Sequence, residues 1–207
     1  MWEGLDTEMD PAFLERDARR KAGKPVEIAR TERLIVRETI LKDVPDLYKI
    51  WREPGTSDYI RPMQPTLEEE LEFMEAYIRH AYAFYDFGLW TVLEKESGQV
   101  VGRAGLFLSE ILENAVELGY MVASRRRRMG YALECGRAVL AYARDTLDMT
   151  EIHLLSDCRN IASVRTAEAL GFVKAEKLCF KEQKLIHLVW KDCQTKPRSE
   201  NVFSGCS

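Results

Sequence analysis

Two hydrophobic periods alternate along the chain. Apolar residues three and four positions apart predict helices that begin at Asp43 and at Thr66, and two more over residues 130–146 and 163–170. Short apolar or alternating runs predict strands. These runs cover residues 33–37, 89–93, 100–107, 115–122, 152–156, 172–180 and 185–190. Because the strands come in groups between the helices, this order predicts a mixed α/β (α+β) domain and not a doubly wound one.

Turn and capping residues support several of these boundaries. Thr66 is followed three residues later by Glu69, which is the pattern of a capping box at a helix start. Ser97 and Gly98 give a turn signal between two predicted strands, so we expect a hairpin there. Residues 53–66 hold three of the seven prolines and are predicted to form a loop.

The two ends of the chain differ from its middle. Residues 1–30 contain seven acids and six bases with few large apolar side chains. Asp10 and Pro11 fit a helix start, and a short helix to about Lys21 would end near Gly23. We therefore divide the chain into three parts. These are an N-terminal extension (1–30), a compact domain (31–192) and a polar C-terminal tail (193–207).

The overall composition is that of a folded, water-soluble protein. Of the 207 residues, 46% are hydrophobic and 31% are charged, and the net charge of −4 disfavours a generally basic nucleic-acid binder. No apolar run approaches the ~18 residues that a membrane span needs. The first ten residues carry four acids and no base, unlike a secretory signal. We therefore expect a cytoplasmic protein without a membrane partner.

The cysteine and histidine residues do not form metal-binding patterns. The five cysteines are scattered and include no Cys-x-x-Cys pair, so we interpret them as free thiols in a reducing compartment. The three histidines, His80, His153 and His187, lack the spacing of zinc ligands. His153 and His187 lie in apolar runs and are predicted to be packed rather than catalytic. We expect no metal cofactor.

The segment most informative about function runs from Glu117 to Ala132. An apolar strand leads into a basic loop, Arg125–Arg128, and the loop leads into a helix through Gly130. The first amides of a helix have no partner within it and carry partial positive charge, and a glycine there lets a ligand approach the backbone. This pattern predicts an anion site suited to phosphates. A solvated basic loop and a nucleic-acid patch are the alternatives.

Several motifs resemble the GNAT superfamily of acyl-CoA-dependent N-acetyltransferases. The family signature (Gln/Arg)-x-x-Gly-x-(Gly/Ala) matches Arg127 to Ala132, and Asn-x-x-Ser followed by Glu-x-x-Gly-Phe matches Asn160 to Phe172. The run Glu117-Leu-Gly-Tyr120 resembles the family's fourth-strand motif. The segment Thr31 to Arg37 resembles the opening of the branch that contains the ribosomal-protein N-terminal acetyltransferases.

This resemblance covers about residues 31–192 and implies a GNAT-like fold, with a central mixed, mostly antiparallel sheet flanked by helices. Two departures stand out. Many members have glycine where Arg128 stands, so this loop should be stiffer and more basic. Some members use a tyrosine as general acid seven residues after the motif asparagine, where this chain has Ala167.

The resemblance also implies a set of coenzyme contacts. The pyrophosphate of acetyl-CoA would bind the loop and the first turn of the helix, and the pantetheine arm would pair with the preceding strand and with Asn160. The predicted loop and helix residues are Arg127, Arg128, Met129, Gly130, Tyr131, Ala132 and Leu133. The predicted strand residues are Tyr120, Met121 and Val122. For Asn160, capping of the next helix is the alternative role.

The reaction requires a neutral amine to attack a thioester. Glu117 is the candidate base, acting through water, and an exposed strand carboxylate is the alternative interpretation. Ser163 is the candidate proton donor to the leaving thiolate, and an ordinary first-turn helix residue is the alternative. The acceptor would lie between the 53–66 loop and the final strands. Nearby aromatic residues should be mostly core: Tyr59, Phe84, Tyr85, Phe87 and Trp90.

We therefore expect an acetyl-CoA-dependent N-acetyltransferase that acts on a primary amine, either a protein N-terminus or a small molecule. Two alternatives stay open. One is a nucleic-acid-binding module that uses Arg125–Arg128, which the net charge of −4 disfavours. The other is a GNAT-like domain that binds coenzyme A without catalysing transfer. The identity of the amine and the formation of a homodimer also stay open.

Overall fold

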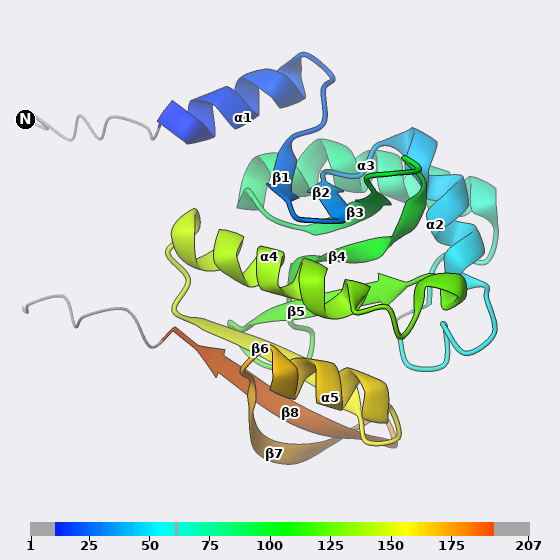
Figure 1. The fold of residues 1–207 in the computed structure, drawn as a ribbon, viewed down its shortest axis with the longest axis vertical. Coiled ribbons are helices and arrows are strands. Elements are labelled where there is room, and N and C mark those ends of the chain that lie inside the picture. Colours follow the sequence, from blue (N-terminus) through cyan, green and yellow to red (C-terminus); the bar gives the residue numbers. More distant parts are fainter. Residues whose placement is uncertain (1–10, 61, 193–207) are drawn as a thin grey trace, which may run out of the picture.

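The computed structural model describes residues 11–60 and 62–192, which form an eight-stranded sheet covered by helices (Figure 1). The strand order is β1-β2-β3-β4-β5-β6-β8-β7. The strands are β1 (Glu27–Arg30), β2 (Leu34–Arg37), β3 (Leu89–Glu94), β4 (Val100–Leu108), β5 (Val116–Val122), β6 (Glu151–Asp157), β7 (Val173–Phe180) and β8 (Gln183–Lys191). Strands β5 and β6 pair in parallel, and the other neighbours pair antiparallel. The expected mixed, mostly antiparallel sheet is confirmed.

Helices lie on both faces of the sheet. They are α1 (Pro11–Lys21), α2 (Val44–Trp51), α3 (Leu67–Tyr85), α4 (Tyr131–Asp145) and α5 (Ile161–Ala169). In the main core Leu118 of β5 is buried in the same cluster as Val139 of α4, whereas Met121, three residues further along β5, clusters with Leu47 of α2. Because side chains alternate along a strand, α4 and α2 cover opposite faces. Figure 1 shows α4 and α5 in front, with α3 behind.

The predicted helix ends are confirmed by their contacts. The Thr66 hydroxyl accepts a hydrogen bond from the Glu69 amide, and the Glu69 carboxylate accepts one from the Thr66 amide, which forms the capping box of α3. Asp43 is the N-cap residue of α2. The predicted strands agree with the observed ones to within one or two residues, which is the usual uncertainty of element ends.

The N-terminal helix is confirmed, and it is attached to the body by ion pairs. Helix α1 ends at Lys21, and Gly23 has a positive φ of 67°. Arg16 and Arg20 both pair with Asp86 at the end of α3, and Arg20 also pairs with Glu38 at 2.7 Å. All four side chains of this cluster are largely buried.

Strand β1 was missed in the sequence analysis. It lies inside the predicted N-terminal extension, and its residue Glu27 pairs with Arg37 of β2 in the register. The division of the chain at residue 31 stays a prediction, but the sheet itself begins at Glu27. The predicted tail, 193–207, lies outside the described residues, as do residues 1–10.

The expectation that the candidate aromatic residues are mostly core was wrong for three of five. Phe87 and Trp90 are buried, but Tyr59, Phe84 and Tyr85 are 39%, 80% and 42% exposed. Phe84 and Tyr85 are the last two residues of α3, and Tyr82 is the last buried residue of that helix. They contact each other edge to face, with ring centroids 4.7 Å apart.

The remaining structural expectations concern membranes, metals and thiols. Among residues 11–60 and 62–192, no helix combines the length and apolar character needed to cross a membrane. The same residues contain no group of three or more His, Cys, Asp or Glu side chains placed to hold a metal ion. Cys135, Cys158 and Cys179 are free thiols, while Cys193 and Cys206 lie outside the described residues. The predicted packing of His153 and His187 is confirmed, because the two rings contact each other.

Candidate functional site

A gap opens between β5 and β6 in the middle of the sheet. Their register contains one pair, Glu117 with His153. Beyond it β5 continues to Val122 in full pairing with β4, and β6 continues to Asp157 in full pairing with β8. The facing edges of β5 and β6 therefore diverge, which leaves backbone donors and acceptors for another extended partner.

The N-terminus of α4 has the features of an anion site. Gly130 is its N-cap residue with a positive φ of 80°, and it makes no side-chain capping bond. The first hydrogen bond of the helix runs from the Glu134 amide to the Gly130 carbonyl, at 2.9 Å. The amides of Tyr131, Ala132 and Leu133 precede that bond, so they have no acceptor within the helix. They can bind an anion together with the positive end of the helix dipole.

Glu94, at the end of β3, is bonded to the loop that leads into α4. Its carboxylate accepts hydrogen bonds from Arg126, Tyr131 and Ser97, each at 2.7 Å. The bonds from Arg126, Tyr131 and Ser97 lower the pKa of Glu94 to about 2. Glu94 is therefore ionised at neutral pH and connects the two ends of the loop that contains Gly130. The sequence analysis did not identify this residue.

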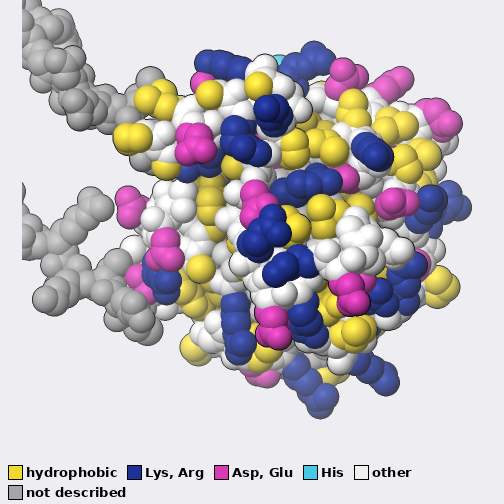
Figure 2. Space-filling view, turned by 45° about the horizontal axis from the view of Figure 1, so that its top comes forward, with side chains coloured by type: hydrophobic (Ala, Val, Ile, Leu, Met, Phe, Trp, Pro, Cys, Tyr) yellow, Lys and Arg dark blue, Asp and Glu magenta, His cyan; other side chains and the backbone are white. Residues whose placement is uncertain are grey.

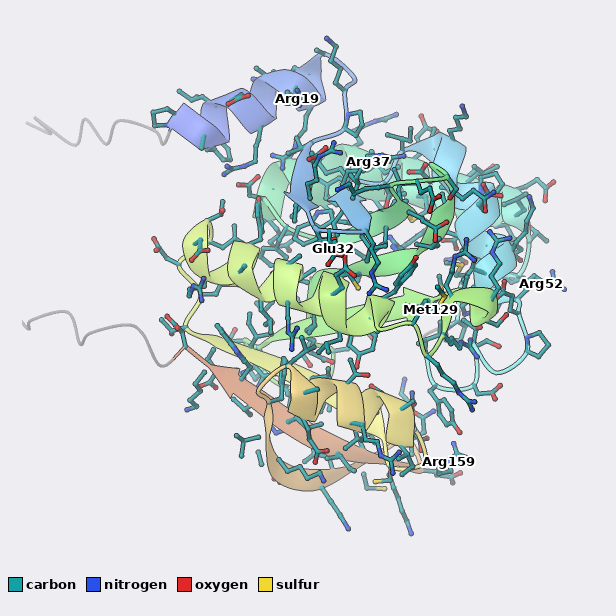
Figure 3. The ribbon with its side chains drawn as sticks, viewed as in Figure 1. Arg19, Glu32, Arg37, Arg52, Met129 and Arg159 are labelled. Atoms are coloured by element: carbon teal, nitrogen blue, oxygen red, sulfur yellow. The ribbon has the colours of Figure 1, made fainter. Side chains whose placement is uncertain are left out.

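Arg33 supports the same loop from the β1–β2 turn. Its guanidinium donates to the Met129 carbonyl at 2.8 Å, pairs with Glu134 at 2.6 Å, and lies over the Tyr131 ring at 4.6 Å. Arg33 belongs to the Thr31–Arg37 motif noted in the sequence, but its contact with the helix start was not foreseen. Figure 3 labels Met129 at the start of α4.

The four consecutive arginines point to different partners. Arg125 bonds Gln99 at 2.9 Å and Arg126 bonds Glu94, so both face the β3–β4 hairpin. Arg127 bonds the Thr56 hydroxyl and, at 3.3 Å, the Val122 carbonyl. Within residues 11–60 and 62–192, Arg128 alone of the four lacks a hydrogen-bond or ion-pair partner, and it has a positive φ of 61°.

These contacts weaken the nucleic-acid interpretation of the arginine run. Three of its four guanidinium groups are engaged within the protein. Figure 2 shows a face of the molecule on which acidic and apolar side chains are interspersed among the basic ones, with no continuous basic surface. Arg128 remains as the cation of the run that is available to a ligand at Gly130.

Helices α4 and α5 begin on the same side of the molecule. In Figure 3, Met129 and Arg159, which precede the two helices, lie at the right-hand side, and Arg52 at the end of α2 lies on that side as well. The 53–60 loop is fastened to this side, because the Glu53 carboxylate accepts a hydrogen bond from the Ser124 amide at 2.5 Å. The anion site and the predicted acceptor loop are therefore neighbours.

Glu117 is a buried carboxylate at the point where β5 and β6 separate. It is 7% exposed, and burial raises its pKa. It accepts hydrogen bonds from the Ser109 hydroxyl and from the Leu155 amide of β6. The interpretation of Glu117 as an exposed strand carboxylate is therefore wrong. A carboxylate with a raised pKa, held by two donors beside a gap, has the features of a general base.

Ser109 is a further site residue that sequence reasoning missed. Its hydroxyl oxygen also accepts from the amides of Ile111 and Leu112, at 3.1 and 2.8 Å. Its position directly after a predicted strand, in a polar stretch, is the signal that could have indicated such a turn.

On the α5 side, Tyr120 reaches across the gap. Its hydroxyl donates to the Ser163 carbonyl at 3.1 Å and lies 3.3 Å from the Ser163 hydroxyl. Asn160 caps α5, since its side-chain oxygen accepts from the Ser163 amide at 3.1 Å. Capping by Asn160 is thus observed, while its contact with pantetheine stays a prediction. Ala167 is fully buried, so no acid reaches the gap from that position.

The structure brings most of the predicted residues to one place. The gap is lined on the β5 side by Glu117, Tyr120 and Val122. Ser163 lies opposite them on α5, and Gly130 precedes the helix that follows β5. Side chains alternate along β5, so Glu117 and Met121 leave it on the face opposite Tyr120 and Val122. The Glu117 carboxylate still reaches the Leu155 amide, whereas the Met121 side chain packs with Leu47 and only its backbone faces the gap. The binding and catalytic roles of all these residues stay predictions.

Comparisons with known proteins agree with this geometry. A family model described as an acetyltransferase (GNAT) domain matches residues 33–173. A search of curated proteins finds the uncharacterized protein YkkB of Bacillus subtilis (strain 168), 36% identical over 88 residues, which are 42% of this chain and 51% of that protein. The match thus spans about half the length of that relative. The uncharacterized N-acetyltransferase p20 of Bacillus licheniformis is 23% identical over 149 residues, covering 72% of this chain and 84% of that protein.

Among solved structures, the fold is similar to a spermidine N-acetyltransferase from Vibrio cholerae in complex with CoA and spermine. The TM-score is 0.65 and the identity 17%, with 77% of this chain and 95% of that chain covered. This likeness concerns the fold alone.

Proposed function

Because the chain belongs to the family of GNAT acetyltransferase domains, we propose that it transfers an acetyl group from acetyl-CoA to a primary amine. The reaction is direct attack of the amine on the thioester. Bound acetyl-CoA supplies the activated acetyl group, and the protein supplies alignment and proton transfer.

One observation carries this proposal. The buried carboxylate of Glu117 lies beside the gap between β5 and β6, and the strand β5 leads from there to the N-terminus of α4. An extended, amide-bearing pantetheine arm fits along the β5 edge at Tyr120 to Val122. A pyrophosphate fits the uncapped amides that follow Gly130. The backbone of this chain provides both the strand edge and the free helix amides, so the residues present suit coenzyme A.

The Val122 carbonyl and Arg127 suggest how this region adapts to a ligand. The Arg127 guanidinium donates a hydrogen bond to the Val122 carbonyl at 3.3 Å. A pyrophosphate at Gly130 would attract that guanidinium, which would free the carbonyl for an amide donor. Arg127 would then neutralise phosphate charge together with Arg128.

Glu117 removes a proton from the acceptor. An alkyl ammonium group titrates near ~10.4 and an α-ammonium group near ~7.7–8.0, so most of the acceptor is protonated at neutral pH and cannot attack. Glu117, with its pKa raised by burial, is a better base than an ordinary carboxylate, because basicity rises with pKa. The Ser109 hydroxyl and the Leu155 amide hold the carboxylate in place.

The departing thiolate needs a proton or a hydrogen-bond donor. Ser163 can provide its hydroxyl, which is located 3.3 Å from the Tyr120 hydroxyl. Burial raises the pKa of Tyr120, so this phenol stays protonated at neutral pH. The Tyr120 hydroxyl can therefore replace the proton that the Ser163 hydroxyl gives up, and the phenolate then takes a proton from water once the thiol has left.

The test is thiol release from acetyl-CoA in the presence of a panel of amines. The panel contains a peptide with a free N-terminus, a polyamine and an aminoglycoside, because the identity of the acceptor is open. We expect thiol release that depends on one class of amine and an acetylated product of matching mass. If coenzyme A binds but no amine supports thiol release, the chain is a coenzyme-binding domain without transferase activity.

Glu117→Gln separates catalysis from binding in the same assay. The amide keeps the shape of the carboxylate but cannot take a proton. We expect unchanged affinity for coenzyme A and a turnover lower by about 100-fold or more. Wild-type turnover by this variant between pH 6 and 9 would mean that water or the acceptor itself manages the proton.

A further inference from the structure

Two histidines on neighbouring strands form a pair, in which His187 is buried and His153 is half-buried. His153 Nδ1 lies 2.9 Å from His187 Nε2, and the ring centroids are 5.2 Å apart with an angle of 25° between the planes. The two rings thus meet edge to edge through a hydrogen bond. In the neutral pair, one nitrogen donates and the other accepts.

This pair, His153–His187, adjoins Glu117. His153 is the register partner of Glu117 where β5 and β6 meet, so their side chains leave the sheet on the same face. His187 lies opposite Leu155 in the β6–β8 register, and Leu155 provides the amide that Glu117 accepts. Burial raises the pKa of Glu117, and a positive charge on His187 would act in the opposite direction.

The outer nitrogen of each ring faces a surface carboxylate. His187 Nδ1 is buried and makes no hydrogen bond with any described residue, and Glu176 Oε1 lies 3.5 Å away. His153 Nε2 lies 3.3 Å from Glu151 Oε1. The carboxylate side chains are 59% and 41% exposed, whereas the two histidine side chains are 10% and 16% exposed. The pair therefore connects the buried corner at Glu117 with solvent.

Other charged groups around the pair set its resting state. Lys191 of β8 pairs with Glu151 at 2.8 Å, and Glu110, in the loop between β4 and β5, raises the pKa of Glu117. Burial lowers the pKa of His153, and Glu151 acts in the opposite direction. His153 is therefore neutral near pH 7 and able to take up a proton.

We propose that the His153–His187 pair accepts the proton that Glu117 has taken from the acceptor amine and releases it to solvent at Glu176 or Glu151. This inference rests on the proposed function. A buried base that has taken a proton cannot act again until that proton leaves. The surface carboxylates are exposed, so they exchange protons freely with water.

The step balances without another reactant. The O–H bond of protonated Glu117 breaks and an N–H bond forms at His187 Nδ1, directly or through one water molecule. Glu117 becomes a carboxylate, and the pair carries one positive charge while its hydrogen bond persists. This requires that the resting proton of His187 is on Nε2, in the bond to His153, so that Nδ1 is free to accept. The proton then leaves from Nδ1 to Glu176, which restores the pair, or the Nε2 proton crosses the 2.9 Å bond to His153 while His153 loses its Nε2 proton to Glu151. After the second route the pair is reset when solvent returns a proton at His153 Nε2 and the Nδ1 proton of His187 leaves to Glu176.

The test uses His187→Gln and His153→Gln, which can keep a hydrogen bond but cannot carry the proton. We expect kcat to fall about tenfold in each variant, less than for loss of the base itself, with KM for both substrates unchanged. Imidazole buffer at high concentration should restore kcat in the variants, because it can carry the proton instead. The wild type should not respond to buffer concentration.

His80→Gln is the matched control, since His80 is an exposed histidine on α3, whereas the pair lies on β6 and β8. It should behave as the wild type, and far-ultraviolet circular dichroism should show that every variant is folded. If the wild type acetylates an amine while both variants keep full kcat and show no buffer effect, the pair carries no proton. If the wild type acetylates no amine, the proposed function fails first. If one variant does not fold, the other decides the result.

Discussion

The phenolic hydroxyl of Tyr120 on β5 donates a hydrogen bond to the Ser163 carbonyl on α5, 3.1 Å away. The bond connects two elements on opposite sides of the gap, where β5 and β6 themselves no longer pair. Tyr120 therefore fixes the position of the first turn of α5 relative to β5. The width of the gap, where we propose that a pantetheine arm binds, depends on this contact.

Tyr120→Phe removes this bond and keeps the packing of the ring. We expect affinity for coenzyme A to fall by about 0.5–1.5 kcal/mol, the usual net contribution of one hydrogen bond. Tyr142→Phe is the control, because the Tyr142 hydroxyl also donates to a main-chain carbonyl, that of Asp86, at 3.3 Å, but away from the gap. Titration calorimetry should show a loss in the first variant and none in the second.

Gly130→Ala tests the anion site. A side chain at a positive φ costs about 1–2 kcal/mol, and here its Cβ would lie 3.5 Å from the Arg33 guanidinium that binds the Met129 carbonyl beside the proposed pyrophosphate site. Gly23→Ala carries a similar strain, since Gly23 has a φ of 67°, but a Cβ there would meet no other atom within 4 Å and lies outside the proposed site. Both variants should lose similar stability on heating, while only Gly130→Ala should lose affinity for coenzyme A. Equal affinities in the two variants would place the pyrophosphate elsewhere.

Arg128→Gly separates backbone strain from charge. Arg128 has a φ of 61°, so glycine should relieve about 1 kcal/mol of strain and raise the melting temperature. Lys181→Gly should do the same, because Lys181 in the β7–β8 turn has a φ of 45°. Only Arg128→Gly should weaken coenzyme binding, and it should flatten the dependence of that binding on salt, since one cation is removed.

Glu94→Gln should loosen the loop that leads into α4. The pKa of Glu94 lies at about 2, below the usual ~4.3 of an unfolded chain. The carboxylate therefore stabilises the fold above pH ~4, and this contribution disappears as the pH falls through 2. The difference in unfolding free energy between wild type and variant should shrink over that range. Glu96→Gln, an exposed neighbour in the same hairpin, should show no such difference.

The pH dependence of Glu117 has the opposite sign. Its pKa is raised by burial, so the folded protein binds a proton there more readily than the unfolded chain does. The wild type should lose stability as the pH rises through this pKa, and Glu117→Gln should not. Activity should fall on the acid side at a pH above the usual range of a glutamate. A stable but inactive variant is the expected outcome.

Local signals in the sequence predict much of this fold. The capping box at Thr66, the helix between Pro11 and Lys21, and the glycine before α4 each depend on residues within a few positions, and all are confirmed. Strand β1 was missed because its four residues, Glu-Ile-Ala-Arg, have charges at both ends and no clear alternation. Its pairing with β2 is what makes it a strand.

The site residues that were missed depend on distant parts of the chain. Glu94 lies 32 residues before Arg126, and Arg33 lies 101 residues before Glu134. No local pattern reveals that a hairpin carboxylate will hold a helix start. The exposure of Phe84 was missed for a related reason. Periodicity indicates which residues share a helix face, but not which part of that face another element covers.

The single pair between β5 and β6 also bears on how the chain is made. Strands β1 to β5 come from residues 27–122, and strands β6 to β8 come from residues 151–191. Each set is continuous in sequence, and they meet at Glu117 and His153. During synthesis, the first five strands can therefore complete their hydrogen bonds before residues 151–191 are available, and the gap between the two sets forms last.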